Sequence, residues 1–354
     1  MKSALILEDG HVFAGQGFAA SGDRFCQAVF HTGMVGLAET LTEPACTGQA
    51  VVSTYPLAGN CGVCNEDFDI PRAGALIVSE ISELTSNFRC DESLEAVLKR
   101  FDIPGISGVD TRFLVRLLRT SGSMRAMVTS DESRFSGPGL EKTLAELASW
   151  TAPDPYGSLK TGGKTYNPDG KKRVALLNTG AREADFAALC ERGVCVKTYG
   201  HDTSAAAILA DKPDGLLLAG GPDALPPEAL IETVRALRAA GLPVLAVEQG
   251  HLLLALAAGA EAERLPCGHR GANYAVRDCA AGNVYITSQN HGWAVKQGSL
   301  PKDCAVAYEN VNDGTIAGLR YKNGDISAAF NPDGCLGAPD LRAVADEFVK
   351  RMEV

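Results

Sequence analysis

The 354-residue sequence lacks features that would place it in several broad classes of protein. No apolar run approaches the roughly 20 residues that cross a bilayer, so a membrane is not an expected partner. The N-terminus reaches Glu8 and Asp9 too early for a secretory signal, which predicts a cytoplasmic protein. Basic residues are outnumbered, with 33 Lys and Arg against 43 Asp and Glu, so nucleic acid is not an expected partner either.

The cysteines do not form an evident disulfide or metal-binding framework. There are 11 of them, an odd number, scattered along the chain. Cys61-Gly-Val-Cys64 is the one CxxC pair, and neither a second pair nor a suitably spaced histidine follows it. We therefore expect reduced thiols and no metal, with a structural zinc that uses Cys61, Cys64 and Cys90 as the alternative.

The length of the chain and the change in composition along it predict two domains joined by a linker. The first, residues 1–150, is rich in short strands and turns, with a hairpin expected at Glu8-Asp9-Gly10. Residues 151–172 are dense in Pro, Gly and Lys and poor in apolar residues, as is typical of a linker. Residues 173–354 form the second predicted domain. The elements expected in the first domain are strands at 3–7, 12–17, 27–32 and 49–54 and helices at 34–42, 111–120 and 140–150.

In the second domain, strands alternate with helices, which predicts a parallel sheet with helices on both faces. The expected strands are 174–177, 194–199, 215–218, 242–247, 285–287 and 326–330, and the expected helices are 183–192, 204–210, 227–240, 252–258 and 339–352. Ligands of such sheets bind at the carboxyl ends of the strands. Loops 178–181 and 220–223 and the turn after residue 247 are therefore candidate binding loops, and a binding loop is also expected at 288–293. Alternative interpretations are a plain chain reversal at Gly220-Gly221-Pro222 and a capped turn with a packed Trp293.

The most informative stretch is residues 241–258, GLPVLAVEQGHLLLALAA. A short apolar strand passes into a Leu- and Ala-rich helix through only Glu248, Gln249, Gly250 and His251. A sharp strand-to-helix turn of this kind is typical of a nucleophile elbow, which presents one side chain above the first turn of the helix. A Cys or Ser is expected at the apex, but here the residue is Glu248.

These motifs together resemble the small, glutamine-hydrolysing subunit of carbamoyl-phosphate synthetase. In the first half the resemblance rests on LEDGHVFAGQGF, VFHTGMVGLAETLTEP, STYPLAGNCGV and GISGVDTRFLVRLLRTSG. In the second half it rests on GHLLLALAAGA, GHRGANY and ITSQNHGWAV. The resemblance implies a mixed, β-rich α/β domain particular to this subunit, followed by a class I glutamine amidotransferase domain.

The resemblance also implies a catalytic triad, and this chain departs from it. In the family a Cys at the elbow attacks the glutamine amide, and a downstream His and Glu serve as base and orienting group. These positions are Glu248, Asn331 and Asp333 here, and we predict that they are inactive. An Asn side chain cannot take a proton from a thiol. None of the six histidines lies in the C-terminal segment, since they are His11, His31, His201, His251, His269 and His291.

The family's glutamine-binding positions are altered in part. The resemblance places them at Thr47, Gly220, Gly221, Gln249, Leu252, Asn290, Gly292 and Trp293. Leu252 stands where the family has Gln. The family's Gly-Pro-Gly-Asp-Pro cradle has become Gly221-Pro222-Asp223-Ala224, with one glycine lost. Glutamine is therefore a doubtful ligand.

The resulting hypothesis is a small subunit with an inactive glutaminase site, retained as a structural or regulatory partner of the large subunit. The family's large subunit uses ATP, Mg and bicarbonate with ammonia, and no cofactor is expected in this chain. Two alternatives remain open: an amidotransferase that still binds or hydrolyses glutamine, and a divergent paralogue with another partner. A relocated nucleophile at Cys267 or Cys335 is disfavoured, because neither follows a strand-to-helix elbow.

Overall fold

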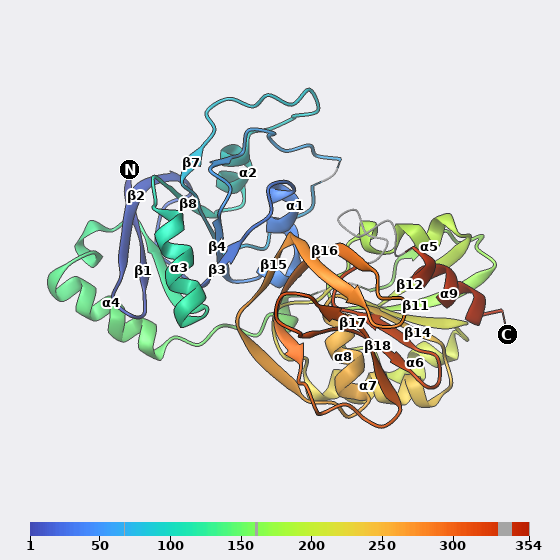
Figure 1. Cartoon of the computed structure of the whole chain (residues 1–354). Helices are drawn as coiled ribbons and strands as arrows, with labels where there is room; N and C mark the ends of the chain where they lie inside the picture. The colour runs from blue at the N-terminus through green and yellow to red at the C-terminus, as the bar shows by residue number, and fades with distance from the viewer. Residues whose placement is uncertain (67, 160–161, 332–341, 354) are drawn as a thin grey trace. The chain divides into compact units, whose positions relative to one another are not determined.

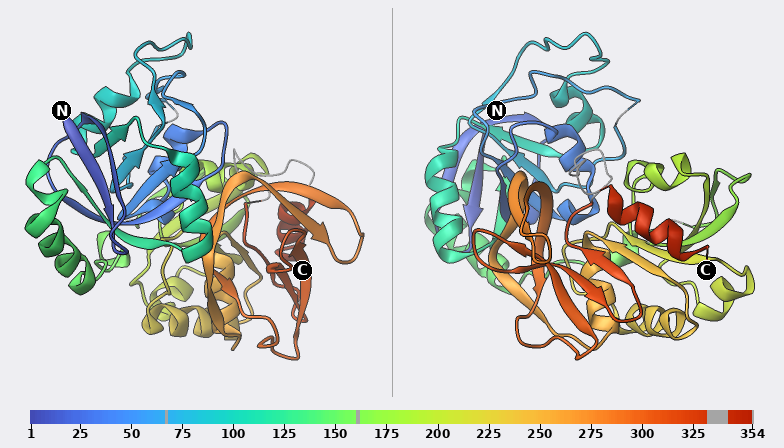
Figure 2. Two further views of the ribbon diagram at one scale, coloured as in Figure 1. Left: turned by 60° about the vertical axis from the view of Figure 1, so that its left-hand side comes forward. Right: turned by 45° about the vertical axis from the view of Figure 1, so that its right-hand side comes forward.

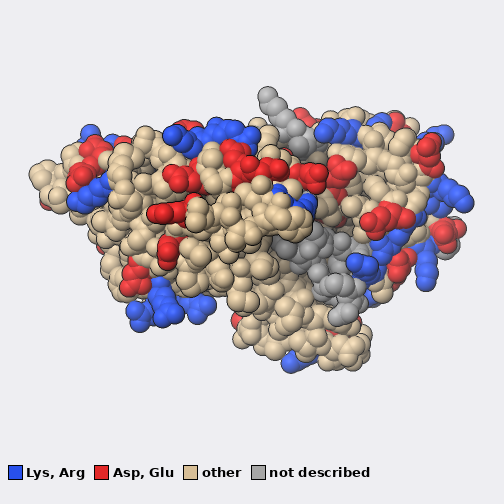
Figure 3. All heavy atoms as spheres, turned by 90° about the horizontal axis from the view of Figure 1, so that it is seen from above, with Lys and Arg blue, Asp and Glu red and all other residues tan. Residues whose placement is uncertain are grey.

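The computed structural model describes residues 1–66, 68–159, 162–331 and 342–353. The chain divides into two compact units, Met1–Asp154 and Pro155–Val354 (Figure 1). Within the described ranges, no helix is long and apolar enough to cross a membrane. On the face drawn in Figure 3, Lys and Arg side chains lie among Asp and Glu side chains in small groups, without a broad basic area.

Unit 1 is built on a closed barrel. Its strands, in order around the barrel, are β1 (Lys2–Leu7), β2 (Val12–Ala19), β8 (Pro104–Ser107), β6 (Ala75–Ile77), β4 (Gln49–Ser53), β3 (Arg24–His31) and β9 (Met124–Thr129). The expected hairpin is present, because β1 and β2 pair antiparallel with Ile6 opposite Val12. A second, two-stranded sheet consists of β5 (Leu57–Ala58) and β7 (Glu80–Ile81).

Short helices cover the barrel of unit 1. They are α1 (Leu37–Thr42), α2 (Leu94–Arg100), α3 (Thr111–Ser121) and α4 (Gly137–Ser149), with single 3-10 turns η1 (Pro44–Cys46) and η2 (Glu132–Arg134). Every residue of β1 after Lys2 is buried, since the strand has the barrel on one face and a helix on the other. Ala4 and Ile6 pack with Leu147 of α4. The predicted helices at 34–42, 111–120 and 140–150 thus correspond to α1, α3 and α4.

Unit 2 contains a ten-stranded sheet whose centre is parallel. The strand order is β10 (Thr165–Tyr166), β12 (Val194–Gly200), β11 (Lys172–Asn178), β13 (Gly215–Ala219), β14 (Val244–Val247), β19 (Ile326–Ala328), β18 (Ile316–Tyr321), β16 (Val284–Val295), β15 (Ala262–Asp278) and β17 (Cys304–Asn310). From β12 to β19 the neighbours run parallel, while β10 and the four strands beyond β19 pair antiparallel.

Helices lie on both faces of this sheet, as its alternating sequence predicts. They are α5 (Ala187–Glu191), α6 (Ala205–Ala210), α7 (Glu228–Ala239), α8 (Gln249–Ala257) and α9 (Ala343–Arg351), with 3-10 turns η3 (Tyr156–Ser158) and η4 (Glu183–Asp185). One core joins α6, α7 and α8 to alternate residues such as Leu216 and Leu218 of β13. A second core joins α5 and α9 to Leu217 on the opposite face. In Figure 2 the red α9 and the yellow α7 lie on opposite sides of the sheet.

The structure differs from the sequence-based expectation in two places. The prediction of a loop at 288–293 is wrong, because these residues continue strand β16, which pairs with β15 from Ala262 to Arg277 through two register shifts. Part of the segment predicted as a linker, 151–172, belongs to unit 2. There Thr165 and Tyr166 pair with the edge of β12, which satisfies backbone groups that an open edge would leave exposed.

Candidate active site

The strand-to-helix elbow lies between β14 and α8, with Glu248 at its apex. Glu248 has φ 58° and ψ −126°, a conformation that a residue with a Cβ seldom adopts. Its N–H donates to Ala328 O at 2.8 Å, so β19 fixes the turn from the side. Two residues later Gly250 packs against β13, where an added Cβ would lie 2.3 Å from Leu218 O. The backbone therefore has the shape expected of an elbow, whichever side chain it carries.

Glu248 occupies the N-cap position of α8, but its side chain makes no capping hydrogen bond to that helix. The carboxylate therefore does not satisfy the free backbone N–H groups of the first turn of α8 through a capping hydrogen bond. The carboxylate is still favoured at this end of a helix by the helix dipole. Stabilisation of the anion makes it a weaker nucleophile.

Asn331 is buried three residues after β19, with 7% of its surface exposed. Its Nδ2 donates to the backbone oxygen of Asp185 at 3.1 Å. Asn331 lines a cavity of about 20 Å³ together with apolar residues that include Leu217, Val247 and Ala345. The side chain is held as a structural amide and has no nitrogen that could act as a base. Asp333 and Cys335 lie outside the described residues.

The cradle loop after β13 contacts the first residue of α8. Gly220 and Gly221 have φ 68° and 134°, so both adopt conformations that favour glycine. A Cβ on Gly221 would lie 2.7 Å from Cβ of Gln249, which brings two of the predicted glutamine-site positions together. Leu252, one turn along α8, is only 3% exposed and belongs to the apolar core between α8 and the sheet.

Asn290 and Gly292 each contact an ion pair between Asp223 and Arg270, which sequence reasoning missed. Arg270 Nη2 donates to Asp223 Oδ2 at 2.5 Å, and Gly292 N donates to Asp223 Oδ1 at 2.5 Å. Arg270 Nη1 donates to Asn290 Oδ1 at 2.8 Å. Burial alone would raise the pKa of Asp223, but the charge of Arg270 and the Gly292 N–H outweigh it and hold that pKa below its usual value. The carboxylate is therefore charged at neutral pH.

The remaining predicted positions make other contacts. Trp293 is partly buried on β16, and the Arg264 guanidinium lies 5.4 Å from the centre of its ring. Thr47 belongs to unit 1, where its hydroxyl donates to Pro44 O at 2.7 Å. Cys267, the described alternative nucleophile, lies within strand β15 and not on an elbow.

Two buried histidines of unit 2 are neutral. His251, three residues after Glu248, lies 2.8 Å from Ser327 Oγ through Nδ1, and burial lowers its pKa to about 4. His291 on β16 lies 2.9 Å from Trp293 O through Nδ1, and burial lowers its pKa to about 3. Both are held by hydrogen bonds to their own unit, which is typical of structural histidines.

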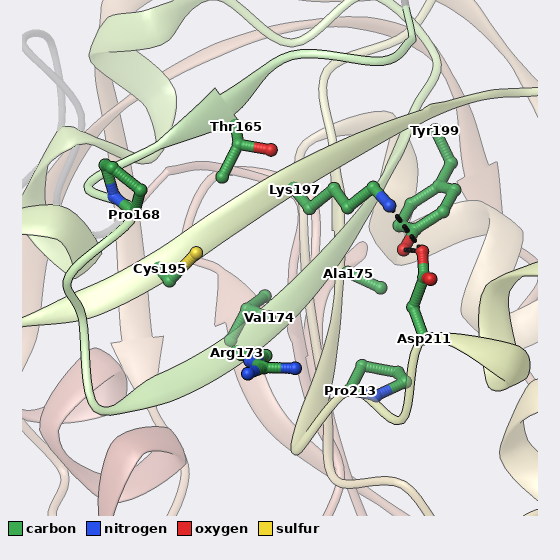
Figure 4. Close-up of a pocket in the computed structure, with 10 residues that line it drawn as sticks. All are labelled: Thr165, Pro168, Arg173, Val174, Ala175, Cys195, Lys197, Tyr199, Asp211 and Pro213. Carbon is green, nitrogen blue, oxygen red and sulfur yellow. Dashed lines mark hydrogen bonds and ion pairs between the residues drawn. The ribbon is translucent and has the colours of Figure 1, made fainter.

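A separate cavity of about 260 Å³ opens beside β10, β11 and β12 (Figure 4). Its polar side is a cluster in which Lys197 Nζ and Tyr199 Oη each donate to Asp211 Oδ2 at 2.5 Å. Burial and the Asp211 carboxylate raise the pKa of Tyr199. No residue of the elbow or cradle lines this cavity, so it is separate from the predicted glutamine site. Among the residues that the structure describes, no group of three or more His, Cys, Asp and Glu could hold a metal.

Comparison with known proteins matches both halves of the chain. Residues 5–128 match the model of the carbamoyl-phosphate synthase small chain, CPSase domain, and residues 177–350 match that of glutamine amidotransferase class I. A glutamine amidotransferase from Thermotoga maritima is a structural neighbour of half of the chain. It is 13% identical, with a TM-score of 0.41, and the match covers 51% of this chain and 97% of the other.

Curated relatives match nearly the full length of the chain. The carbamoyl phosphate synthase pyrimidine-specific small chain of Halalkalibacterium halodurans is 39% identical over 100% of this chain and 98% of its own. The carbamoyl phosphate synthase small chain of Oceanobacillus iheyensis is 38% identical over 98% of this chain and 95% of its own. The protein therefore belongs to the carbamoyl-phosphate synthase small chain family.

Proposed function

We propose that this small chain does not hydrolyse glutamine and serves as the non-catalytic partner of a carbamoyl-phosphate synthase large subunit. The observation that carries the proposal is Glu248 at the apex of the elbow, in the strained conformation that elsewhere presents a nucleophile. The side-chain chemistry has changed while the backbone that would present it is intact.

A carboxylate cannot replace a thiolate in this reaction. A Cys thiolate attacks an amide to give a thioester and ammonia, with a base to manage the proton. Attack by Glu248 would instead form a mixed anhydride from a much more stable amide. The base position is also lost, because the amide of Asn331 has no basic nitrogen, and its Nδ2 donates to Asp185 O.

The subunit would then support synthesis from free ammonia. By the family resemblance, the large subunit supplies the sites for ATP, Mg and bicarbonate, and this chain contributes stability, tunnel sealing or regulation in the cytoplasm. The product would enter pyrimidine or arginine synthesis. The Halalkalibacterium halodurans relative, named as pyrimidine-specific, favours the first pathway.

The test uses the purified complex of this chain with a large subunit encoded in the same genome. We expect carbamoyl phosphate to form from ammonium chloride and not from glutamine, with no ammonia released from glutamine. Glutamine hydrolysis that Glu248→Ala abolishes would overturn the proposal. Hydrolysis that survives Glu248→Ala would place the activity elsewhere in the complex.

A second candidate, a subunit that binds glutamine without cleaving it, is favoured by one observation. Gly221 still packs against Gln249 at the start of α8, so part of the predicted cradle is formed. Isothermal titration with glutamine distinguishes the two, since absence of binding heat removes this candidate. Failure to form a complex with any large subunit would instead favour the divergent paralogue.

A further inference from the structure

The ion pair between the cradle loop and the β15–β16 ribbon is nearly sealed from solvent. The side chains of Asp223 and Arg270 are each 1% exposed. Charged groups are seldom buried to this extent unless they are paired and hydrogen-bonded. Both oxygens of Asp223 receive a hydrogen bond, one from the Arg270 guanidinium and one from the Gly292 backbone.

Guanidinium and backbone N–H groups directed at one carboxylate are what proteins use to bind a free carboxylic acid. Gly292 is fitted to this task because it has no side chain. A Cβ there would lie 2.8 Å from Asp223 Oδ2 and 3.1 Å from Arg270 Nη2, so any larger residue would displace the carboxylate. The two donors lie on adjacent strands, with Arg270 opposite Asn290 in the β15–β16 register.

We propose that Arg270 and Gly292 form a carboxylate-binding site that the chain fills with its own Asp223. The inference rests in part on the proposed function, because Asn290 and Gly292 are positions where glutamine is expected to bind. It adds a second obstacle to that of the missing nucleophile. An external α-amino acid would have to displace a buried ion pair before its own carboxylate could reach these donors.

The direct test removes the internal carboxylate and supplies a small external one. Asp223→Ala leaves Arg270 buried opposite an empty space of about the size of formate. We expect the melting temperature of unit 2 to fall by on the order of 10 °C, as for a broken buried ion pair. Sodium formate should then restore it in a saturable manner, relative to sodium chloride at equal ionic strength. The unsubstituted chain should not respond to formate.

Three further variants serve as controls. Asp211→Ala removes a carboxylate from the exposed pair with Lys197 and should show no formate effect. Asp223→Ala with Arg270→Leu should lose the response, because the guanidinium is gone. Asp223→Asn, which keeps the space filled, should be destabilised without being restored. If Asp223→Ala does not fold alone, its refolding yield with formate against chloride becomes the readout.

The outcomes separate this inference from the proposed function. An Asp223→Ala chain that keeps its melting temperature and ignores formate overturns the self-filled site. So does an unsubstituted chain that formate or glutamine stabilises, even where no hydrolysis is seen. Hydrolysis of glutamine by the unsubstituted complex overturns the proposed function, whereas the response of Asp223→Ala to formate tests the self-filled site by a separate measurement.

Discussion

At the scale of single residues, the backbone of Glu248 at the apex of the elbow lies in a strained conformation. Left-handed conformations in residues other than glycine typically cost about 1–3 kcal/mol, and they persist where the surroundings impose them. At Glu248 the conformation is imposed by the hydrogen bond from its N–H to Ala328 O and by the packing of Gly250 on β13. The strain follows from the backbone and does not depend on the carboxylate.

The first prediction separates the backbone from the side chain at position 248. Glu248→Gly should be more stable than Glu248→Ala by about 1 kcal/mol, since both lose the carboxylate and only glycine relieves the strain. Urea unfolding of the two variants measures the difference. Equal stability would show that the positive φ carries no cost.

Sequence reasoning located some of these residues and missed others for identifiable reasons. Glu248 stands out because a short strand, a glycine and a helix surround it within a few positions. Asp223 gives no such signal, since its partner Arg270 is 47 residues away and the two meet only through tertiary structure.

At the scale of elements, β16 shows how a buried polar strand can be mistaken for a loop. Gln289 and His291 are polar, and a glycine follows, which is typical of a loop in sequence. In the structure the same residues bond across to β15, where His269 Nδ1 lies 3.1 Å from Gln289 Oε1. A buried polar network satisfies these groups, so the strand continues where hydrophobicity alone predicts a break. The parallel strands, in contrast, are apolar and could be predicted.

The second prediction concerns the contact between α8 and β13. Gly250→Ala should destabilise unit 2 by about 1–3 kcal/mol, because the new Cβ would overlap the Leu218 carbonyl. Helix propensity alone predicts the opposite, a gain of about 1 kcal/mol. Ala236→Gly on the exposed side of α7 is the matched control for propensity, and it should lose about 1 kcal/mol. A stabilising Gly250→Ala would disprove the close contact.

At the scale of the whole molecule, the second unit holds groups that make its stability depend on pH. Burial lowers the pKa of His251 to about 4 and that of His291 to about 3, from the usual value of about 6.5 for histidine. A base whose pKa is lower in the folded state binds protons preferentially when unfolded. Its contribution to stability is therefore complete above pH 6.5 and is lost as the pH falls toward the folded value.

The third prediction is a loss of stability in unit 2 below pH 6.5, of up to about 1.4 kcal/mol per pH unit for each buried histidine. His251→Asn should reduce the slope by one histidine, while His11→Asn, at a half-exposed site in unit 1, should not change it. In a Trp150→Phe background, Trp293 fluorescence reports the unfolding of unit 2 alone, since the chain has two tryptophans. A slope unaffected by His251→Asn would contradict the assignment.

The intact elbow has a consequence for how activities are assigned across genomes. Its shape is set by strand pairing, by a glycine behind the turn and by a carbonyl of the neighbouring strand. A comparison of whole sequences scores the many residues that maintain this backbone. The residue at the apex, which would carry the nucleophile, is only one of the 354 positions in such a comparison. A survey that assigns activities by overall sequence similarity therefore detects the shared fold and does not test whether the reactive side chain is present. In this family, the residue at the apex of the elbow should be recorded before glutamine or ammonia is assigned as the nitrogen source of an organism.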